Sequence, residues 1–246
     1  MKRHLPLVGR LGPDAIAAAF DRGAAEMARE GEAASAIAAQ ALAWLDEVVT
    51  EAKRQFPPSA PIGCAEGCAY CCHLKVIATP AEAIGVFQYL TAATPAAELT
   101  ALRARIERAH EATRGLTADA RARLKLPCPL LVDSRCIAYE RRPLHCAGAN
   151  AADPAACREA FENPERDVPV LHYPAQRIAA DAATAGVSRA LFESGRDGRM
   201  VELIAALALL FADPSAAERW QRGEQAFRAA VDRELEVMLE RAADRA

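Results

Sequence analysis

Eight cysteines lie between positions 64 and 157 of this 246-residue chain, and they constrain its fold more than any other feature. They are Cys64, Cys68, Cys71, Cys72, Cys128, Cys136, Cys146 and Cys157. The first four fall within nine positions, and the other four follow after a gap of 55 residues. Because closely spaced thiolates are typical ligands of zinc and of iron–sulfur clusters, we expect distant segments to fold around a metal site.

Structural disulfides are the main alternative interpretation of these cysteines. Disulfide frameworks are typical of small secreted chains that lack a sufficient core, whereas 246 residues can bury an ordinary hydrophobic core. Residues 1–12 are interrupted by Pro6, Gly9 and Arg10 and contain no apolar stretch of about 7–15 residues, which a signal peptide requires. We therefore predict a cytoplasmic protein whose reduced thiols bind metal.

Charge and hydropathy argue against nucleic-acid and membrane partners. A net charge of −3 and 5% aromatic residues provide little attraction for phosphates and few platforms for bases. The longest apolar run, residues 200–211, contains Glu202 and is shorter than the roughly 20 residues of a membrane span, so we predict a buried helix there. The basic stretch 103–125 is predicted to be a solvated helix face, with an anion-facing or partner-facing patch as the alternative.

Alanine, leucine, arginine and glutamate dominate outside the cysteine region, which favours helices. The predicted fold is mainly α, a helical bundle around an irregular cysteine-rich metal-binding segment with one small β-hairpin in residues 129–139. The predicted divisions are an N-terminal helical segment (1–60), a cysteine-cluster metal-binding domain (61–165) and a C-terminal helical segment (166–246). One continuous domain is the alternative.

Prolines and capping residues predict where the helices begin. Thr79-Pro80-Ala81-Glu82 has the form of a capping box. Further helices are predicted to begin at Thr94-Pro95, Asp153-Pro154, Pro174 and Asp213-Pro214. Cys157 would then lie near a helix N-terminus, where the dipole favours a thiolate. The last helix is predicted to present one apolar face to the core or to a second subunit, made of Trp220, Phe227, Val231, Leu235 and Met238.

The cysteine spacing indicates more than one metal ion. Cys64-x3-Cys68-x2-Cys71 matches the spacing of radical S-adenosylmethionine enzymes, which use it to hold a cubane cluster. Such enzymes need a strand–helix barrel, and alternating strands are absent here. Because the neighbouring side chains of Cys71 and Cys72 diverge in a helix or a strand, two metal centres or one multinuclear cluster are expected. Two four-thiolate zinc sites remain an alternative.

Several stretches together resemble the YkgJ or CxxCxxCC family of cysteine-cluster proteins. They are residues 67–74, 79–83, 128–131, 136–146 and 150–157, so that the resemblance covers about residues 61–162. It implies a zinc- or iron-chelating domain, often labelled an iron–sulfur oxidoreductase, in which all eight cysteines form the metal site. Two departures are a first gap of three residues where the family name implies two, and Ala147 where many members have arginine. Flagellin lysine methylases share a related cysteine signature.

Four side chains beside the cysteines are further candidates for a role at the metal site. His73 and His145 each adjoin a cysteine and are predicted to pack beside the site or support it rather than to ligate metal. Arg141 and Arg142 either offset the charge of a cluster or are solvated. Catalytic residues stay unassigned.

The main functional hypothesis is a metal-binding protein that carries an iron–sulfur cluster with a redox or cluster-assisted enzymatic role. Alternatives are a zinc-binding structural or regulatory module, a metal chelator or carrier, and an enzyme of S-adenosylmethionine-linked protein methylation or radical chemistry. The cofactor is expected to be an iron–sulfur cluster or zinc. The expected partners are metal ions and a protein, with no membrane and no nucleic acid, and the sequence leaves open whether the chain is an enzyme.

Overall fold

The computed structural model describes residues 3–5, 10–65 and 67–243. Residues 1–2, 6–9, 66 and 244–246 lie outside it, and these include part of the N-terminal stretch in which no signal peptide was found. Among the described helices, none combines the length and the apolar character that a membrane crossing needs.

The described residues are mainly helical, as predicted. The α-helices are α1 (Pro13–Arg29), α2 (Ala34–Gln55), α3 (Pro80–Ala93), α4 (Ala96–Thr113), α5 (Ala118–Leu124), α6 (Leu144–Gly148), α7 (Pro154–Glu162), α8 (Pro174–Glu193), α9 (Leu203–Ala212), α10 (Ala216–Gln221) and α11 (Arg233–Ala243). The short 3-10 helices are η1 (Tyr70–His73), η2 (Tyr139–Arg141) and η3 (Arg228–Ala230), and the strands are β1 (Ile77–Ala78), β2 (Leu131–Val132), β3 (Arg135–Cys136) and β4 (Val201–Glu202).

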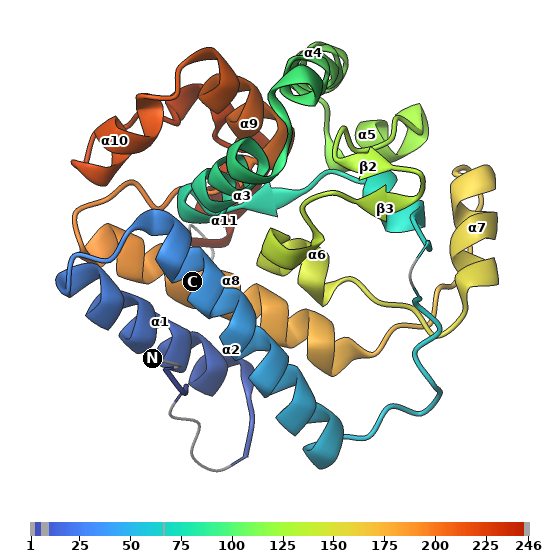
Figure 1. Ribbon diagram of the computed structural model, residues 1–246. Coiled ribbons are helices and arrows are strands. Elements are labelled where there is room, and N and C mark those ends of the chain that lie inside the picture. The colour runs from blue at the N-terminus through green and yellow to red at the C-terminus, as the bar shows by residue number, and fades with distance from the viewer. Residues whose placement is uncertain (1–2, 6–9, 66, 244–246) are drawn as a thin grey trace.

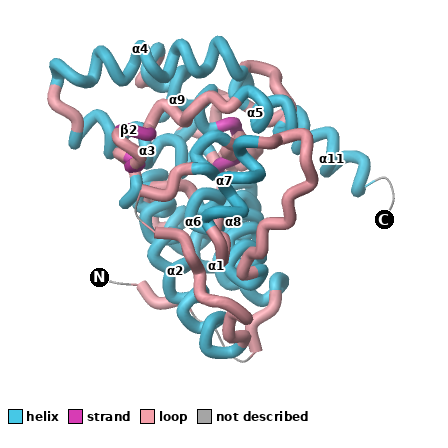
Figure 2. The backbone as a smooth tube through the Cα atoms, turned by 90° about the vertical axis from the view of Figure 1, so that its right-hand side faces the viewer, coloured by secondary structure: helices cyan, strands magenta, loops and turns pink. Residues whose placement is uncertain are grey.

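Two groups of helices form the body of the molecule. Helices α1, α2 and α8 pack against one another on one side, while α3, α4 and α9 form the other group (Figures 1 and 2). Helix α2 contacts both α3 and α8, and the short helix α6 packs against α8 and α2. The cysteine-bearing segments therefore rest against helices from both ends of the sequence.

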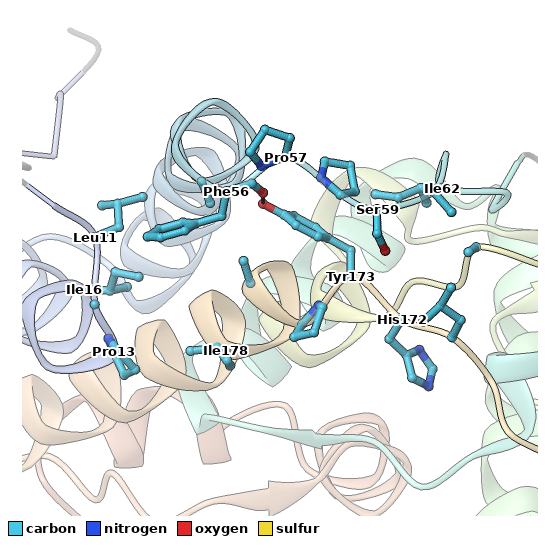
Figure 3. A pocket seen from close by; sticks show the side chains of 18 residues that line it. Leu11, Pro13, Ile16, Phe56, Pro57, Ser59, Ile62, His172, Tyr173 and Ile178 are labelled. Atoms are coloured by element: carbon cyan, nitrogen blue, oxygen red, sulfur yellow. Dashed lines mark hydrogen bonds between the residues drawn. The ribbon is translucent and has the colours of Figure 1, made fainter.

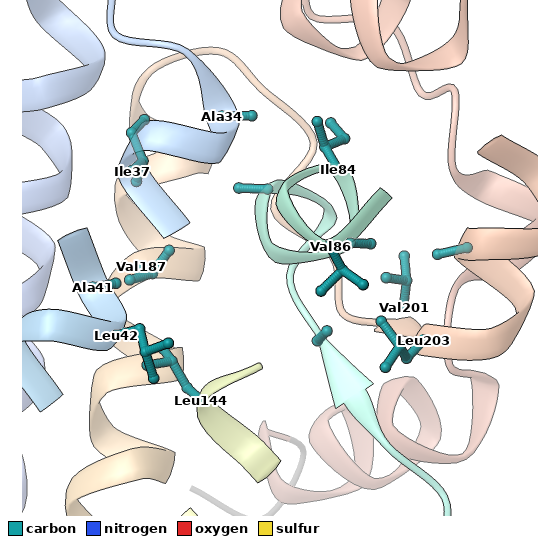
Figure 4. Packing of buried hydrophobic residues seen from close by; sticks show 14 of the residues in the cluster. Ala34, Ile37, Ala41, Leu42, Ile84, Val86, Leu144, Val187, Val201 and Leu203 are labelled. Atoms are coloured by element: carbon teal, nitrogen blue, oxygen red, sulfur yellow. The ribbon is translucent and has the colours of Figure 1, made fainter. Parts of the chain in front are cut away.

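One hydrophobic core joins the beginning, the middle and the end of the chain. Figure 4 shows Ala41 and Leu42 of α2 beside Val187 of α8 and Leu144 of α6, with Ile84 of α3 across from them. Each of these side chains is buried. Because burial of a large aliphatic side chain is worth about 1.5–3 kcal/mol, this shared core is the main source of stability for the frame behind the cysteines.

The predicted hairpin is present, and a second strand pair accompanies it. Strands β2 and β3 pair antiparallel, with Leu131 opposite Cys136. The two residues between them, Asp133 and Ser134, have φ angles of 48° and 61°, as the mirror-image turn of a two-residue hairpin requires. The second pair joins β1 to β4 and was not predicted, because two-residue strands show no alternating pattern.

The predicted helix starts agree with the structure except in the last segment. Thr79 caps α3 in a complete capping box with Glu82, and α4, α7, α8 and the buried α9 are where they were expected. The prediction of one long amphipathic helix after Asp213 is wrong. The chain breaks into α10, η3 and α11, and Gly223, just after α10, has a φ of 91° that a regular helix cannot contain.

Candidate metal centre

The eight cysteines reach one region of the molecule from separate segments. Cys64 and Cys68 lie in the loop after α2, and Cys71 and Cys72 lie in η1. Cys128 precedes β2, whereas the other three belong to regular elements: Cys136 ends β3, Cys146 lies in α6 and Cys157 lies in α7. All eight are free thiols.

The first cysteine loop is fixed to the segment that precedes α7. The Gly63 N–H donates to the Ala151 carbonyl oxygen at 2.9 Å, and the Ala151 N–H donates back to the Cys64 sulfur at 3.1 Å. A Cβ atom at Gly63 would lie 2.3 Å from the Ala152 oxygen, so only glycine permits this approach. Gly67, with a φ of 89°, then turns the chain toward Cys68.

A second set of backbone contacts joins η1 to the hairpin. The Cys128 N–H donates to the Cys72 carbonyl oxygen at 2.7 Å, which bridges the long sequence gap between the two groups of cysteines. The hairpin register then places Cys136 across from Leu131, close to Cys128. A backbone hydrogen bond therefore joins the early and late cysteine segments.

The electrostatic interactions among the thiols separate Cys64, Cys68 and Cys157 from Cys72, Cys128, Cys136 and Cys146, whereas Cys71 interacts with both groups and is counted here with the first. The outer set is Cys64, Cys68, Cys71 and Cys157, because burial and the thiols of Cys64, Cys68 and Cys71 together raise the pKa of Cys157. The inner set is Cys72, Cys128, Cys136 and Cys146. Burial and the thiols of Cys128, Cys136 and Cys71 raise the pKa of Cys146, and Cys72 interacts with Cys128 and Cys146.

Cys71 and Cys72 form the junction between the two sets. Their side chains are hydrogen-bonded, which lowers the pKa of Cys71 to about 7 and raises the pKa of Cys72. Cys71 also acts on Cys64 and Cys157 of the outer set and on Cys136 and Cys146 of the inner set. One thiol is thus in electrostatic range of both sets.

The two sets differ in their exposure. In the outer set Cys64 and Cys71 are exposed, whereas Cys128, Cys136 and Cys146 of the inner set pack against the hydrophobic core. Burial raises the pKa of Cys128 to about 12. The pKa of Cys157 is also raised, by burial and by the neighbouring thiols, which acts against the thiolate that its helix position was expected to favour.

A buried carboxylate supports the inner set from behind. Glu82 is 4% exposed, and its side chain accepts hydrogen bonds from the Thr79 N–H at 2.7 Å and the Leu144 N–H at 2.7 Å. Leu144 is the first residue of α6, which carries Cys146. The capping box of α3 therefore also holds the N-terminal turn of a cysteine-bearing helix.

An arginine that the sequence placed on a solvated face is instead buried beside the cysteines. Arg121 is 2% exposed, and its three guanidinium nitrogens have no hydrogen-bond partner among the described residues. Burial lowers its pKa, while Glu202 and Cys128 act in the opposite direction. The rest of the stretch 103–125 agrees better with the prediction, since Arg103, Arg108 and Arg123 are exposed.

The two histidines have partners of their own. The His73 Nδ1 lies 3.1 Å from the Ala69 carbonyl oxygen, and its ring stands 4.6 Å from that of Phe161. The His145 Nδ1 lies 3.2 Å from Nη2 of Arg177. These contacts suit packing beside the cysteines. Arg142 stacks on Tyr139 at 4.2 Å and acts on Cys136, whose pKa it lowers against the effect of burial.

Thiol donors suit a soft metal ion, although in this structure the sulfur atoms do not surround a common point. Eight free thiols with an unpaired buried cation beside them suit an anionic metal–thiolate centre. No group of three or more Cys, His, Asp or Glu side chains in the described part of the chain is already arranged to hold an ion. Since thiols must lose protons before they ligate, closing the site requires both deprotonation and convergence.

A separate apolar cavity lies near the first cysteine loop. It has a volume of about 460 Å³ and is lined by the start of α1, the end of α2, residues 56–62 and the start of α8. Figure 3 shows Phe56 and Ile16 facing this space and the hydrogen bond of 2.8 Å that Tyr173 donates to the Phe56 carbonyl oxygen. None of its described lining residues is a cysteine, so the cavity is distinct from the thiols.

Comparison with known families gave one match. Residues 63–167 match the model of the CxxCxxCC family, which is described as a putative zinc- or iron-chelating domain. All eight cysteines fall inside the matched region. Comparisons with curated proteins and with solved structures gave no match to the chain. Over residues 63–167 the chain is therefore similar to this family of cysteine-rich domains, and the similarity supports metal binding by the cysteines.

Proposed function

We propose that the eight cysteines bind metal as two adjoining centres, one formed by the inner set and one by the outer set. The observation that carries this proposal is that Cys157 interacts with the thiols of Cys64, Cys68 and Cys71, while Cys146 interacts with those of Cys128 and Cys136. Four thiolates are a complete ligand set for a zinc ion, an iron ion or a cubane cluster. In this proposal Cys71 serves the outer centre and Cys72 serves the inner centre.

The inner centre has a structural role in this proposal. Three of its cysteines pack against the core, and they come from β3, from α6 and from the loop before β2. Apart from short elements these segments contain little regular structure. A metal held there joins pieces that hydrogen bonding alone leaves weakly connected, as structural zinc does in other small folds.

The outer centre is the functional one, and we assign it an iron–sulfur cluster with a redox role. Cys64, Cys68 and Cys71 have the spacing of a cubane-binding loop, and α7 supplies Cys157 as a fourth donor. Cys64 and Cys71 are exposed, so a cluster at this position is within reach of a protein or a small molecule. With four thiolate ligands such a cluster would supply electron transfer, and the chain's own residues would hold and expose it.

Metal content measured on matched variants tests the proposal. Protein purified without oxygen is expected to contain iron, to show the visible absorption of an iron–sulfur cluster, and to hold a second metal ion in a four-thiolate environment by X-ray absorption. Cys68→Ser is expected to remove the visible absorption and leave the second metal. Cys146→Ser is expected to remove the second metal and to loosen the fold. Colourless protein with two zinc ions per chain would favour the zinc module and refute the redox role, and one ion per chain would refute the division into two centres.

A further inference from the structure

Arg121 has an unusual environment for a charged side chain. It lies in α5, four residues after the Thr117 that caps this helix, and only 2% of it is exposed. Nε, Nη1 and Nη2 of its guanidinium all lack a hydrogen-bond partner among the described residues. A buried arginine without a partner is costly, because its charge has been removed from water and none of its donors is satisfied.

Its neighbour in the same helix shows the ordinary arrangement. Arg123 is exposed and forms ion pairs with Asp119 at 3.0 Å and with Glu165 at 2.6 Å. Two residues apart in sequence, one arginine is thus fully paired on the surface and the other is unpaired in the interior. Side-chain length and helix propensity cannot explain this difference, since both are the same residue in the same helix.

The nearby acidic group does not satisfy Arg121. Glu202 is the carboxylate that acts on it, but the two Glu202 oxygens already accept the Ile204 N–H at 3.1 Å and the Ala205 N–H at 2.7 Å as the cap of α9. The remaining ionisable neighbour is the thiol of Cys128. As a neutral thiol, Cys128 is a weak acceptor and offers the guanidinium little.

We propose that Arg121 is the counter-cation of the inner metal centre and donates N–H···S hydrogen bonds to the metal-bound thiolate of Cys128. This inference rests on the proposed function. A divalent ion with four thiolates carries two excess negative charges, so metal binding creates the anion that a buried, unpaired guanidinium needs. Hydrogen bonds from surrounding groups to metal ligands typically change metal affinity by about 10–100-fold, and we expect Arg121 to contribute in that range.

Titration with Co²⁺, whose thiolate complexes absorb strongly, tests the inference on the full-length metal-free chain. In Arg121→Met the dissociation constant for Co²⁺ is expected to rise about 10–100-fold with an unchanged number of ions bound. Arg121→Lys, which keeps the charge with fewer donors, is expected to lose less. Arg123→Met is the matched control in the same helix and is expected to bind Co²⁺ as the wild type does.

Unfolding of the metal-free variants by urea provides an independent readout. Because Arg121→Met removes an unpaired buried charge, the metal-free variant is expected to be at least as stable as the wild type. Equal Co²⁺ affinity in wild type and Arg121→Met would overturn the inference. So would a loss of metal-free stability that a further Glu202→Gln substitution restores, since Glu202 would then be the true partner. A wild type without any thiolate–Co²⁺ absorption would refute the proposed function itself.

Discussion

Cys71 and Cys64 are both exposed thiols of the outer set, yet the structure predicts different reactivity for them. The hydrogen bond from Cys72 lowers the pKa of Cys71 to about 7. Partial burial of the thiol itself, together with the nearby thiols of Cys68 and Cys71, raises the pKa of Cys64 above the ordinary value, which is about 8.5. Alkylation by iodoacetamide requires the thiolate, so the metal-free protein at neutral pH should react first at Cys71.

The expected ratio follows from two opposing effects. At pH 7 about half of Cys71 is thiolate, compared with at most about 3% for a thiol whose pKa is about 8.5 or higher. The thiolate of lower pKa is the weaker nucleophile, with a Brønsted coefficient of about 0.4–0.5, which reduces the advantage about fivefold. We therefore expect Cys71 to react at least about three times faster than Cys64 at pH 7.

Peptide mapping by mass spectrometry during the alkylation measures both rates in one sample. As pH rises and both groups become thiolates, the ratio is expected to fall and then to invert, because only the nucleophilicity difference remains. Cys72→Ala removes the hydrogen-bond donor and is expected to bring the two rates together at pH 7. The reasoning is refuted if Cys64 reacts as fast as Cys71 at pH 7, or if Cys72→Ala leaves the ratio unchanged.

Three further outcomes are expected for the metal-free protein. Glu82→Ala leaves the buried Thr79 and Leu144 N–H groups unpaired and should lower the free energy of unfolding in urea by about 1–3 kcal/mol for each group; Glu98→Ala, at an exposed first-turn position of α4, should change it by less than about 0.5 kcal/mol. A Cβ at Gly186 of α8 would lie 2.3 Å from the Ala17 oxygen of α1, whereas a Cβ at Gly85 of α3 would lie 3.5 Å from its nearest atom. In the same assay Gly186→Ala should therefore be less stable than Gly85→Ala by about 1–3 kcal/mol. Equal stability of the two variants would contradict the close packing of α1 on α8. Burial raises the pKa of most of the thiols, that of Cys128 to about 12, so the folded chain keeps protons that the unfolded chain loses above about pH 8.5. The free energy of unfolding should therefore fall as the pH rises above about 8.5. A free energy of unfolding that does not change with pH would show that the thiols are not buried.

Local sequence signals predicted the parts of this fold that depend on local interactions. Thr79 and Glu82 form a capping box from side chains three residues apart, and Asp153 caps α7 from the position just before it. The two-residue turn at 133–134 likewise needs only its own backbone. The cysteines could be gathered into one predicted site because their chemistry leaves few other uses for so many reduced thiols.

The remaining features depend on contacts between distant segments, which a single sequence does not display. Arg121 belongs to a basic stretch whose other members are mostly exposed, and its burial results from packing rather than from its neighbours in sequence. The assignment of each cysteine to the inner or outer set depends on how η1, the hairpin and α6 meet. The sequence did contain an indication of the role of Glu202. A carboxylate inside an apolar run needs hydrogen-bond donors, and Glu202 accepts them as the N-cap of α9.

Helix α6 has a consequence for how such a domain is inherited. It carries Cys146, and it packs against α8, which begins at Pro174, beyond the end of the family match at residue 167. The matched segment thus does not include α8, the helix against which its own cysteine-bearing helix α6 packs. In evolutionary terms the segment cannot be transferred alone without exposing part of its core. A gene fusion that moved only residues 63–167 would leave Leu144, which is 1% exposed here, facing water. A recipient protein would have to supply a helix in place of α8 from its own sequence.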